Sequence, residues 1–210
     1  MRFQIRAIQK ISLQIPPKTL TVLLGPNGSG KSTILKILAT LALPTSGQAF
    51  VFGYDVTCTP EQVRGVTGFL PENLSPPSDV TAYEYLNLVG HLRKVSTELS
   101  SRIEELLQKV RLVRWRDVPL QTFSRGMQQR LGFAQTMLGN PDLYLLDEPL
   151  AALDASGRAM VLKTLQELKA TGKTIVVATH RDEFFREIAD QCVFLENGRI
   201  IEITGGDRRK

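Results

Sequence analysis

The chain has 210 residues, of which 42% are apolar and 22% are charged, and its formal net charge is +5. These values are ordinary for a globular protein and exclude a chain that is disordered throughout. The length suits one large domain, which we expect to cover 1–210. No run approaches the roughly 18–20 apolar residues that a membrane-spanning helix needs. The N-terminus also lacks the pattern of a secretion signal, so we expect a cytoplasmic protein.

Two small basic clusters contribute to the positive charge, one at 111–116 and one at 208–210. Nucleic acid and anionic lipid both bind such clusters. A solvated surface and a chain end are the simpler interpretation of clusters this small. We therefore expect no nucleic-acid partner.

The first three apolar runs along the chain are short and closely spaced. They cover 10–15, 20–24 and 48–52, with Pro16-Pro17 and the segment 45–47 as turns. Closely spaced strands joined by turn residues are typical of antiparallel pairing. We therefore expect an antiparallel β-subdomain in this part of the chain.

Further strand-like runs follow at 66–70, 143–146, 174–179, 191–195 and 200–203. The runs 143–146 and 174–179 are nearly all apolar, which is typical of parallel strands covered on both faces. We therefore expect these later strands to form a mainly parallel core sheet.

The middle of the chain has a different period. Between residues 80 and 139, leucines and other apolar residues recur at helical spacing, which predicts a helical subdomain inserted at about 73–139. A further helix is expected over 155–170, with Asp154 as its N-cap. The predicted fold is thus α/β, with a mainly parallel core sheet, an antiparallel β-subdomain and an inserted helical subdomain.

A glycine-rich segment between the run 20–24 and a helical pattern fits G-x-x-x-x-G-K-[ST], the phosphate-binding loop. Glycines let backbone N–H groups turn toward phosphate oxygens, and the following helix adds its positive N-terminal end. In this pattern Lys31 reaches the β- and γ-phosphates and Ser32 supplies a hydroxyl to Mg²⁺. The segment consists of Gly25, Pro26, Asn27, Gly28, Ser29, Gly30, Lys31, Ser32 and Thr33.

Two carboxylates end the apolar run 143–146. Asp147 is placed to hold the hydration shell of Mg²⁺, as the acid ending this strand does in P-loop enzymes. Glu148 is placed to orient and deprotonate an attacking water. A strand ending in two acids is weak evidence alone, but together with a phosphate loop it indicates a P-loop NTPase that uses Mg²⁺.

The order of the motifs resembles that of the ATP-binding cassette (ABC) ATPases over nearly the whole chain. Beyond the two motifs above, the resemblance covers a glutamine-loop position at Glu72, a signature motif at 123–127, a dimer-seam loop at 151–154 and a switch histidine at His180. It implies that Ser124 and Gly126 bind ATP and that His180 is catalytic. It also implies that Phe3 stacks on adenine, although a core phenylalanine explains Phe3 equally well.

The resemblance also implies partners. Two cassettes of this family pair head to tail, so that each ATP lies between the phosphate loop of one chain and the signature motif of the other. ATP closes the dimer and hydrolysis opens it. The partners expected are therefore a second nucleotide-binding domain, most simply a second copy of this chain, and a separate transmembrane permease that holds the protein at the inner face of the membrane.

The sequence departs from the family pattern at three positions. Glu72 replaces the usual glutamine, and it could still meet Mg²⁺ or its water. Arg125 and Met127 replace a glycine and a glutamine of the signature motif. The residues at the glutamine-loop and signature positions are together similar to those of bacterial exporter ATPases of the drug, polysaccharide, and haem or cytochrome c biogenesis types. This resemblance implies export.

Two alternatives stay open at this point. One is a soluble cassette ATPase that acts on nucleic acid or the ribosome. Repair and chromosome members of that class insert a long coiled coil where this chain has about 90 residues of short helices. The other is an inactive cassette that only binds, which the presence of Lys31, Asp147, Glu148 and His180 argues against.

Overall fold

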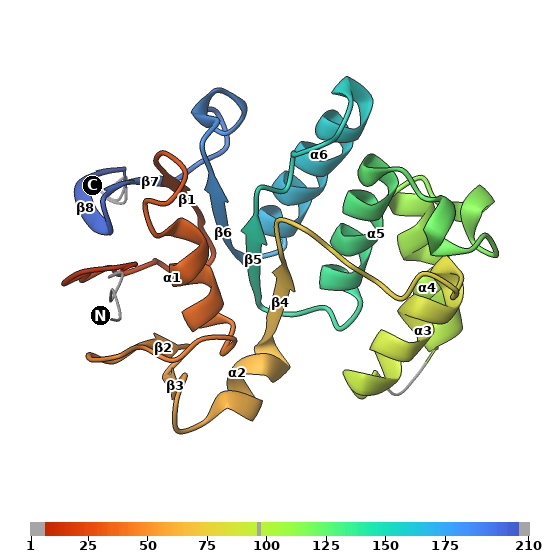
Figure 1. The fold of residues 1–210 in the computed structure, drawn as a ribbon, viewed down its shortest axis with the longest axis horizontal. Helices are drawn as coiled ribbons and strands as arrows, with labels where there is room; N and C mark the ends of the chain where they lie inside the picture. Colours follow the sequence, from red (N-terminus) through yellow and green to blue (C-terminus); the bar gives the residue numbers. More distant parts are fainter. Residues whose placement is uncertain (1–6, 96–97, 206–210) are drawn as a thin grey trace, which may run out of the picture.

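The computed structural model describes residues 7–95 and 98–205. Its centre is a six-stranded sheet with the order β4-β5-β6-β1-β7-β8 (Figure 1). The first five strands in this order run parallel, and β8 is antiparallel to β7. The strands are β1 (Leu20–Leu24), β4 (Thr67–Leu70), β5 (Leu143–Asp147), β6 (Thr174–Thr179), β7 (Gln191–Glu196) and β8 (Arg199–Gly205).

Helices cover both faces of this sheet because its central strands are apolar on both sides. On β5, Tyr144 and Leu146 pack in one apolar cluster, while Leu143 and Leu145 pack in another on the opposite face. The first cluster includes residues of α5 (Arg125–Met137) and α6 (Ala155–Ala170), and the second includes residues of α1 (Lys31–Leu38). Complete burial of β1, β5 and β6 follows from this two-sided covering.

The inserted helices α3 (Ala82–Leu92) and α4 (Leu99–Lys109) lie beyond β4, to the right in Figure 1. Helix α3 begins with a capping box, in which the Thr81 hydroxyl accepts from the Glu84 N–H and the Glu84 carboxylate accepts from the Thr81 N–H. The apolar faces of α3 and α4 belong to the same hydrophobic cluster as residues of α5 and of the sheet. Helix α5 therefore joins the inserted helices to the core. Short 3₁₀ turns lie at Val113–Trp115, Leu120–Thr122 and Asp182–Phe184.

The expected antiparallel pairing of the early runs is only partly right. Strand β1 lies inside the parallel sheet, between β6 and β7, and the segment 10–15 forms no strand in the described structure. Within 48–52 only β2 (Phe50–Val51) is a strand, and it pairs antiparallel with β3 (Tyr54–Asp55), which the sequence did not indicate. Sequence proximity predicted the pairing wrongly because burial on both faces decides where β1 lies.

The later elements follow the expectations more closely. The mainly parallel sheet and the helix 155–170 are both present, and the Asp154 carboxylate accepts from the Gly157 N–H at 2.7 Å, as an N-cap does. The run expected at 66–70 begins one residue later, because Val66 ends a helix, α2 (Pro60–Val66), that was not predicted. Over the described part of the chain, no helix is both long and apolar enough to cross a bilayer.

Candidate functional site

The phosphate loop leads from the carboxyl end of β1 into α1. Gly30 precedes the helix with a φ of 102°, a conformation that favours glycine. A Cβ there would lie 2.7 Å from Ile8 Cγ2 and 2.8 Å from the Ala7 carbonyl oxygen, so the N-terminal segment also excludes a side chain. The glycine is thus required by both its backbone conformation and its neighbours.

The Lys31 side chain folds back over this loop. Its Nζ donates to the carbonyl oxygens of Gly25 at 2.7 Å and Pro26 at 2.9 Å, and the residue is buried. Desolvation lowers the pKa of Lys31, and the carboxylates of Glu148, Asp147 and Glu72 act in the opposite direction. An ammonium held in this way is a positive charge ready to meet an anion above the loop.

The loop also offers hydrogen-bond donors. Among the described residues, the N–H groups of Gly30, Lys31 and Ser32 have no protein acceptor, and the Ser29 hydroxyl is buried with no partner. Unpaired donors at the start of a helix, beside a lysine ammonium, form a binding site for phosphate oxygens. The donor set therefore fits the triphosphate of a nucleotide.

Asp147 ends β5 close to this loop and is only 3% exposed. Desolvation raises its pKa, which the Ser32 hydroxyl opposes through a hydrogen bond. The carboxylates of Glu72 and Glu148 raise this pKa further, while Lys31 lowers it. The fold therefore brings together residues from β1, β4, β5 and their loops that are far apart in sequence.

This set of residues is also suited to a hydrated Mg²⁺. The Ser32 hydroxyl and the Asp147 carboxylate supply oxygen ligands, and Mg²⁺ usually keeps several waters and takes further oxygens from substrate phosphates. Glu72 is exposed on the loop after β4 and near enough to Lys31 and Asp147 to act on the pKa of each. Within the described residues, no three His, Cys, Asp or Glu side chains form a metal site by themselves.

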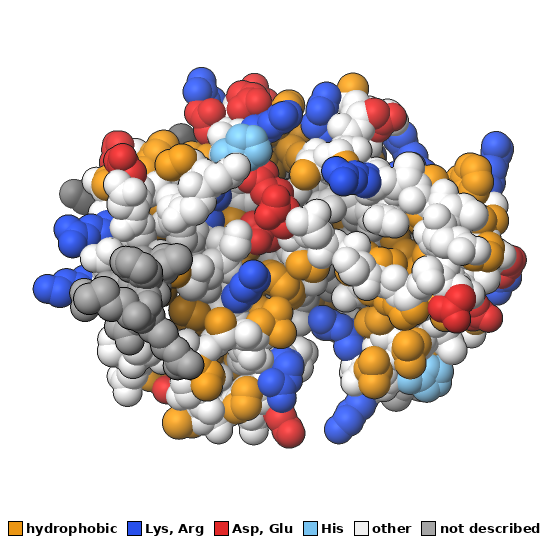
Figure 2. All heavy atoms as spheres, viewed as in Figure 1, with side chains coloured by type: hydrophobic (Ala, Val, Ile, Leu, Met, Phe, Trp, Pro, Cys, Tyr) orange, Lys and Arg blue, Asp and Glu red, His pale blue; other side chains and the backbone are white. Residues whose placement is uncertain are grey.

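The Glu148 carboxylate is held by residues at the end of β6. Its Oε2 accepts from the Thr179 hydroxyl at 2.9 Å, and its Oε1 accepts from the His180 N–H at 3.0 Å and lies 2.7 Å from His180 Nδ1. The Glu148 side chain is 12% exposed and that of His180 is 48% exposed. Figure 2 shows acidic side chains beside a histidine, above the region where β5 and β6 end in Figure 1.

Sequence reasoning missed the role of Thr179 in this arrangement. The residue is buried at the last position of β6, directly before His180, and its hydroxyl also accepts from the Arg181 N–H at 3.1 Å. A polar residue that ends an otherwise apolar parallel strand, one position before a candidate histidine, was the signal available. Such strand ends are where ligands of α/β proteins gather.

The signature segment lies at the start of α5. The exposed Ser124 is the N-cap, and its hydroxyl accepts from the Met127 N–H at 3.2 Å. A Cβ on Gly126 would lie 2.8 Å from the Ala152 carbonyl oxygen, so this glycine lets α5 pack against the loop after β5. No hydrogen bond joins Ser124 or Gly126 to 25–33 within the described residues.

Phe3 lies outside the described residues, so its proposed contact with adenine stays a prediction.

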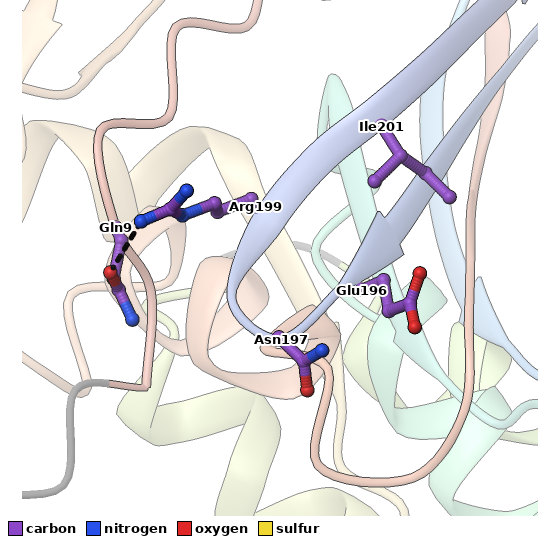
Figure 3. Close-up of a pocket in the computed structure, with 5 residues that line it drawn as sticks. All are labelled: Gln9, Glu196, Asn197, Arg199 and Ile201. Atoms are coloured by element: carbon purple, nitrogen blue, oxygen red, sulfur yellow. Dashed lines mark hydrogen bonds between the residues drawn. The ribbon is translucent and has the colours of Figure 1, made fainter.

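A cavity of about 350 Å³ lies beside the β7–β8 hairpin, where Arg199 donates to Gln9 Oε1 at 3.3 Å (Figure 3). Its lining contains none of the predicted site residues and consists of Gln9, Glu196, Asn197, Arg199 and Ile201.

Known proteins resemble this chain in sequence over most of its length. A family described as "ABC transporter" matches residues 8–151. The chain is 36% identical over 204 residues to the daunorubicin/doxorubicin resistance ATP-binding protein DrrA of Streptomyces peucetius, in an alignment that covers 96% of this chain and 62% of that protein. It is also 36% identical over 200 residues to a probable sulfate/thiosulfate import ATP-binding protein of Chlorella vulgaris, covering 94% of this chain and 84% of that protein.

Solved structures share the fold. A dimeric ATP-binding cassette in a post-hydrolysis state, bound to ADP and Pi, superposes with a TM-score of 0.85 and 26% identity, over 95% of this chain and 90% of that one. The chain spans less than two thirds of the length of the drug-resistance relative. The family match extends over more than half of this chain and includes the phosphate loop and both carboxylates. The chain therefore belongs to the ABC transporter family as one of its ATP-binding cassettes, the P-loop ATPase class that the motifs predicted.

Proposed function

We propose that this chain binds and hydrolyses Mg-ATP as the nucleotide-binding subunit of a membrane exporter. The observation that carries the proposal is the Glu148 carboxylate, held by Thr179 and His180 beside the buried Asp147. Lys31 and the free N–H groups of the phosphate loop lie at the same edge of the sheet. Phosphate binding, metal ligation and base catalysis are thereby brought to one place.

Each residue has a separate role in this proposal. Lys31 and the unpaired N–H groups of Gly30 and Ser32 bind the β- and γ-phosphates. Ser32 and Asp147 would hold Mg²⁺ and Glu72 would contact the ion or one of its waters. The bound ion would neutralise charge that develops on the phosphate oxygens. Glu148 orients the attacking water and takes its proton, while His180 and Thr179 fix the direction of the Glu148 carboxylate.

Assembly into a dimer completes this site. Ser124 is exposed at the N-terminus of α5 and makes no hydrogen bond to the phosphate loop of its own chain. An anion site at that helix end is therefore free for the ATP of a second cassette. The dimeric structural relative supports this arrangement, and a second copy of this chain is the simplest partner.

Export is the finer part of the proposal. The drug-resistance relative and the motifs around Glu72 and Ser124 favour an exporter. The import relative has the same sequence identity, so overall similarity does not separate the two directions. A separate permease would hold the chain at the cytoplasmic face of the membrane. Energised inverted vesicles that carry the chain and its permease test this, because ATP should drive a fluorescent drug inward if the machine exports, and not if it imports.

The alternative is a soluble cassette that acts on nucleic acid or the ribosome. The described helices between β4 and α5 are short, and none of them resembles the long coiled coil of repair and chromosome members. DNA or ribosomes that stimulate ATP turnover more strongly than membranes containing the permease would favour this alternative.

Glu148→Gln is the test of the catalytic site. The amide keeps the size of the side chain and removes its basicity, so turnover should fall by about 10²–10⁴-fold while ATP still binds. Steady-state phosphate release gives the turnover and calorimetry gives the affinity. Glu187→Gln, on the exposed turn after β6, is a matched control and should keep wild-type turnover. Turnover of Glu148→Gln near that of the wild type would contradict the proposal.

A further inference from the structure

A buried glutamine on α5 contacts the backbone of the loop after β5, which contains Glu148. Gln129 is 5% exposed, and its Nε2 donates to the Glu148 carbonyl oxygen at 3.1 Å. The residues that follow it on α5, Leu131 to Ala134, are buried in the apolar core. An amide in such surroundings destabilises the fold unless it is hydrogen bonded. This one is directed at the peptide of the residue that we propose as the general base.

That peptide has an uncommon conformation. Glu148 has a φ of 47°, in the left-handed region that side chains with a Cβ rarely adopt. Its N–H donates to the Ala178 carbonyl oxygen at 2.8 Å, which ties it to β6. Its carbonyl oxygen accepts from the Ala151 N–H at 3.0 Å within the same turn, and from Gln129. Gln129 is therefore the contact that ties the carbonyl side of this residue to a helix outside the turn.

The backbone conformation of Glu148 decides where its carboxylate points. Rotation of this peptide would turn the side chain away from the Thr179 hydroxyl and from His180, the groups that hold it. Residues in sparsely populated backbone regions persist only where the surrounding structure holds them. Helix α5 holds the loop twice, through Gln129 and through the close approach of Gly126 to the Ala152 carbonyl oxygen.

We propose that Gln129 is a positioning residue for ATP hydrolysis, which holds the Glu148 peptide in its left-handed conformation and so aims the general base. The inference rests on the proposed role of Glu148. In this proposal α5, which begins at the signature segment, acts on the general base of its own chain as well as on the ATP of the partner cassette. Gln129 itself touches neither water nor nucleotide in this proposal.

The test is a pair of substitutions with similar shape. Gln129→Met keeps the length of the side chain and removes the donor, while Gln129→Glu places an acceptor against the carbonyl oxygen. We expect kcat to fall about tenfold for Gln129→Met, the effect of losing one hydrogen bond that positions the base, and further for Gln129→Glu. KM for ATP and the calorimetric affinity should stay within about twofold of the wild type, because the phosphate loop is untouched.

Thr136→Val is the matched control on the same helix. Thr136 is fully buried, and its hydroxyl donates to the Phe133 carbonyl oxygen of its own helix at 2.7 Å. This variant loses a buried hydrogen bond of α5 that has no connection to Glu148, so its kcat should remain near that of the wild type. An equal fall of kcat in Thr136→Val and Gln129→Met would assign the effect to general loosening of α5 and overturn the inference.

A double mutant separates positioning from structure. With Glu148→Gln in place there is no base to aim, so adding Gln129→Met should lower the residual single-turnover rate no further. A further tenfold loss in this background, or wild-type kcat in both Gln129 variants, would overturn the inference. If Gln129→Met does not fold, Gln129→Glu decides in the same assays. Failure of the proposed function would give a different result from failure of this inference, because the Glu148→Gln single mutant would then have normal turnover.

Discussion

His180 Nδ1 lies 2.7 Å from Glu148 Oε1, and the His180 backbone N–H donates to the same oxygen at 3.0 Å. One residue therefore contacts the carboxylate twice, through its ring and through its backbone. The two residues are 32 positions apart in sequence and meet because β5 and β6 are adjacent parallel strands that end together. The ring contact can be removed while the backbone contact remains.

We expect His180→Ala to lower kcat by about 10–100-fold, less than the loss of the base itself, because Thr179 and the backbone N–H still hold the carboxylate. ATP affinity should change little. Steady-state turnover with calorimetry measures both. The control is His91→Ala, the other histidine of the chain, whose Nδ1 contacts the Asn87 carbonyl oxygen within α3. Turnover of His180→Ala within twofold of the wild type would exclude a role for the ring.

Lys31→Ala should weaken ATP binding by at least tenfold, because it removes the positive charge at the phosphate loop. It also removes the two hydrogen bonds to the carbonyl oxygens of Gly25 and Pro26, so the empty loop should lose some order. Lys36→Ala removes the same charge from an exposed position on the same helix and should bind ATP normally. Calorimetric titration compares the two, and equal affinities would show that the loop is not the phosphate site.

Ser124 both caps α5 and, in the proposed dimer, meets the ATP of the partner. Ser124→Asp separates these roles, since aspartate is as good an N-cap as serine but its charge repels a phosphate. In the Glu148→Gln background, which should dimerise with Mg-ATP, adding Ser124→Asp should abolish the dimer and leave ATP binding and thermal stability unchanged. Light scattering after size exclusion measures the assembly.

The control for that experiment is Gln121→Asp, which adds the same charge at an exposed position three residues earlier. It should dimerise normally. A Ser124→Asp double mutant that also dimerises normally with Mg-ATP would remove the signature segment from the composite site. Bulk at the same position, as in Ser124→Arg, should prevent closure too, although it also removes the N-cap.

Burial raises the pKa of Asp147 above its ordinary value of 3.8, which makes the ionised residue unfavourable for folding. The folded chain then binds a proton more tightly than the unfolded chain. The contribution of Asp147 to stability therefore falls as pH rises from about 3.8 through the raised pKa. Asp147→Asn should be more stable than the wild type at pH 7, with Tm higher by about 2–4 °C for each 1 kcal/mol of relief.

This advantage of Asp147→Asn should shrink as the pH is lowered toward 3.8, and it should be absent in Asp142→Asn, an exposed acid just before the same strand. Thermal unfolding without nucleotide at several pH values measures the difference. A wild type that is more stable than Asp147→Asn at pH 7 would contradict the desolvation argument. The substitution should still abolish turnover, because it removes the carboxylate that we propose as a ligand of Mg²⁺.

Much of the site was predictable because its motifs are local. The phosphate loop, Asp147 and Glu148 are recognised from contiguous residue types that one chemistry requires, and α6 follows from an N-cap and a helical period. Strands β5 and β6 were recognised for the same reason, since a short run of apolar residues bounded by turn residues is typical of a strand that is buried on both faces.

What the sequence determined by itself was thus the chemistry of each segment and the class of fold. Only the tertiary structure decided that β1 lies between β6 and β7, that Thr179 and His180 hold Glu148, and that Gln129 reaches the Glu148 peptide from α5. These relations depend on strand order and helix packing. They join residues that are 19 positions apart, such as Gln129 and Glu148, and residues that are much farther apart, such as Thr21 and Val176. No local pattern encodes them, because they arise when two apolar faces of one sheet are buried at the same time.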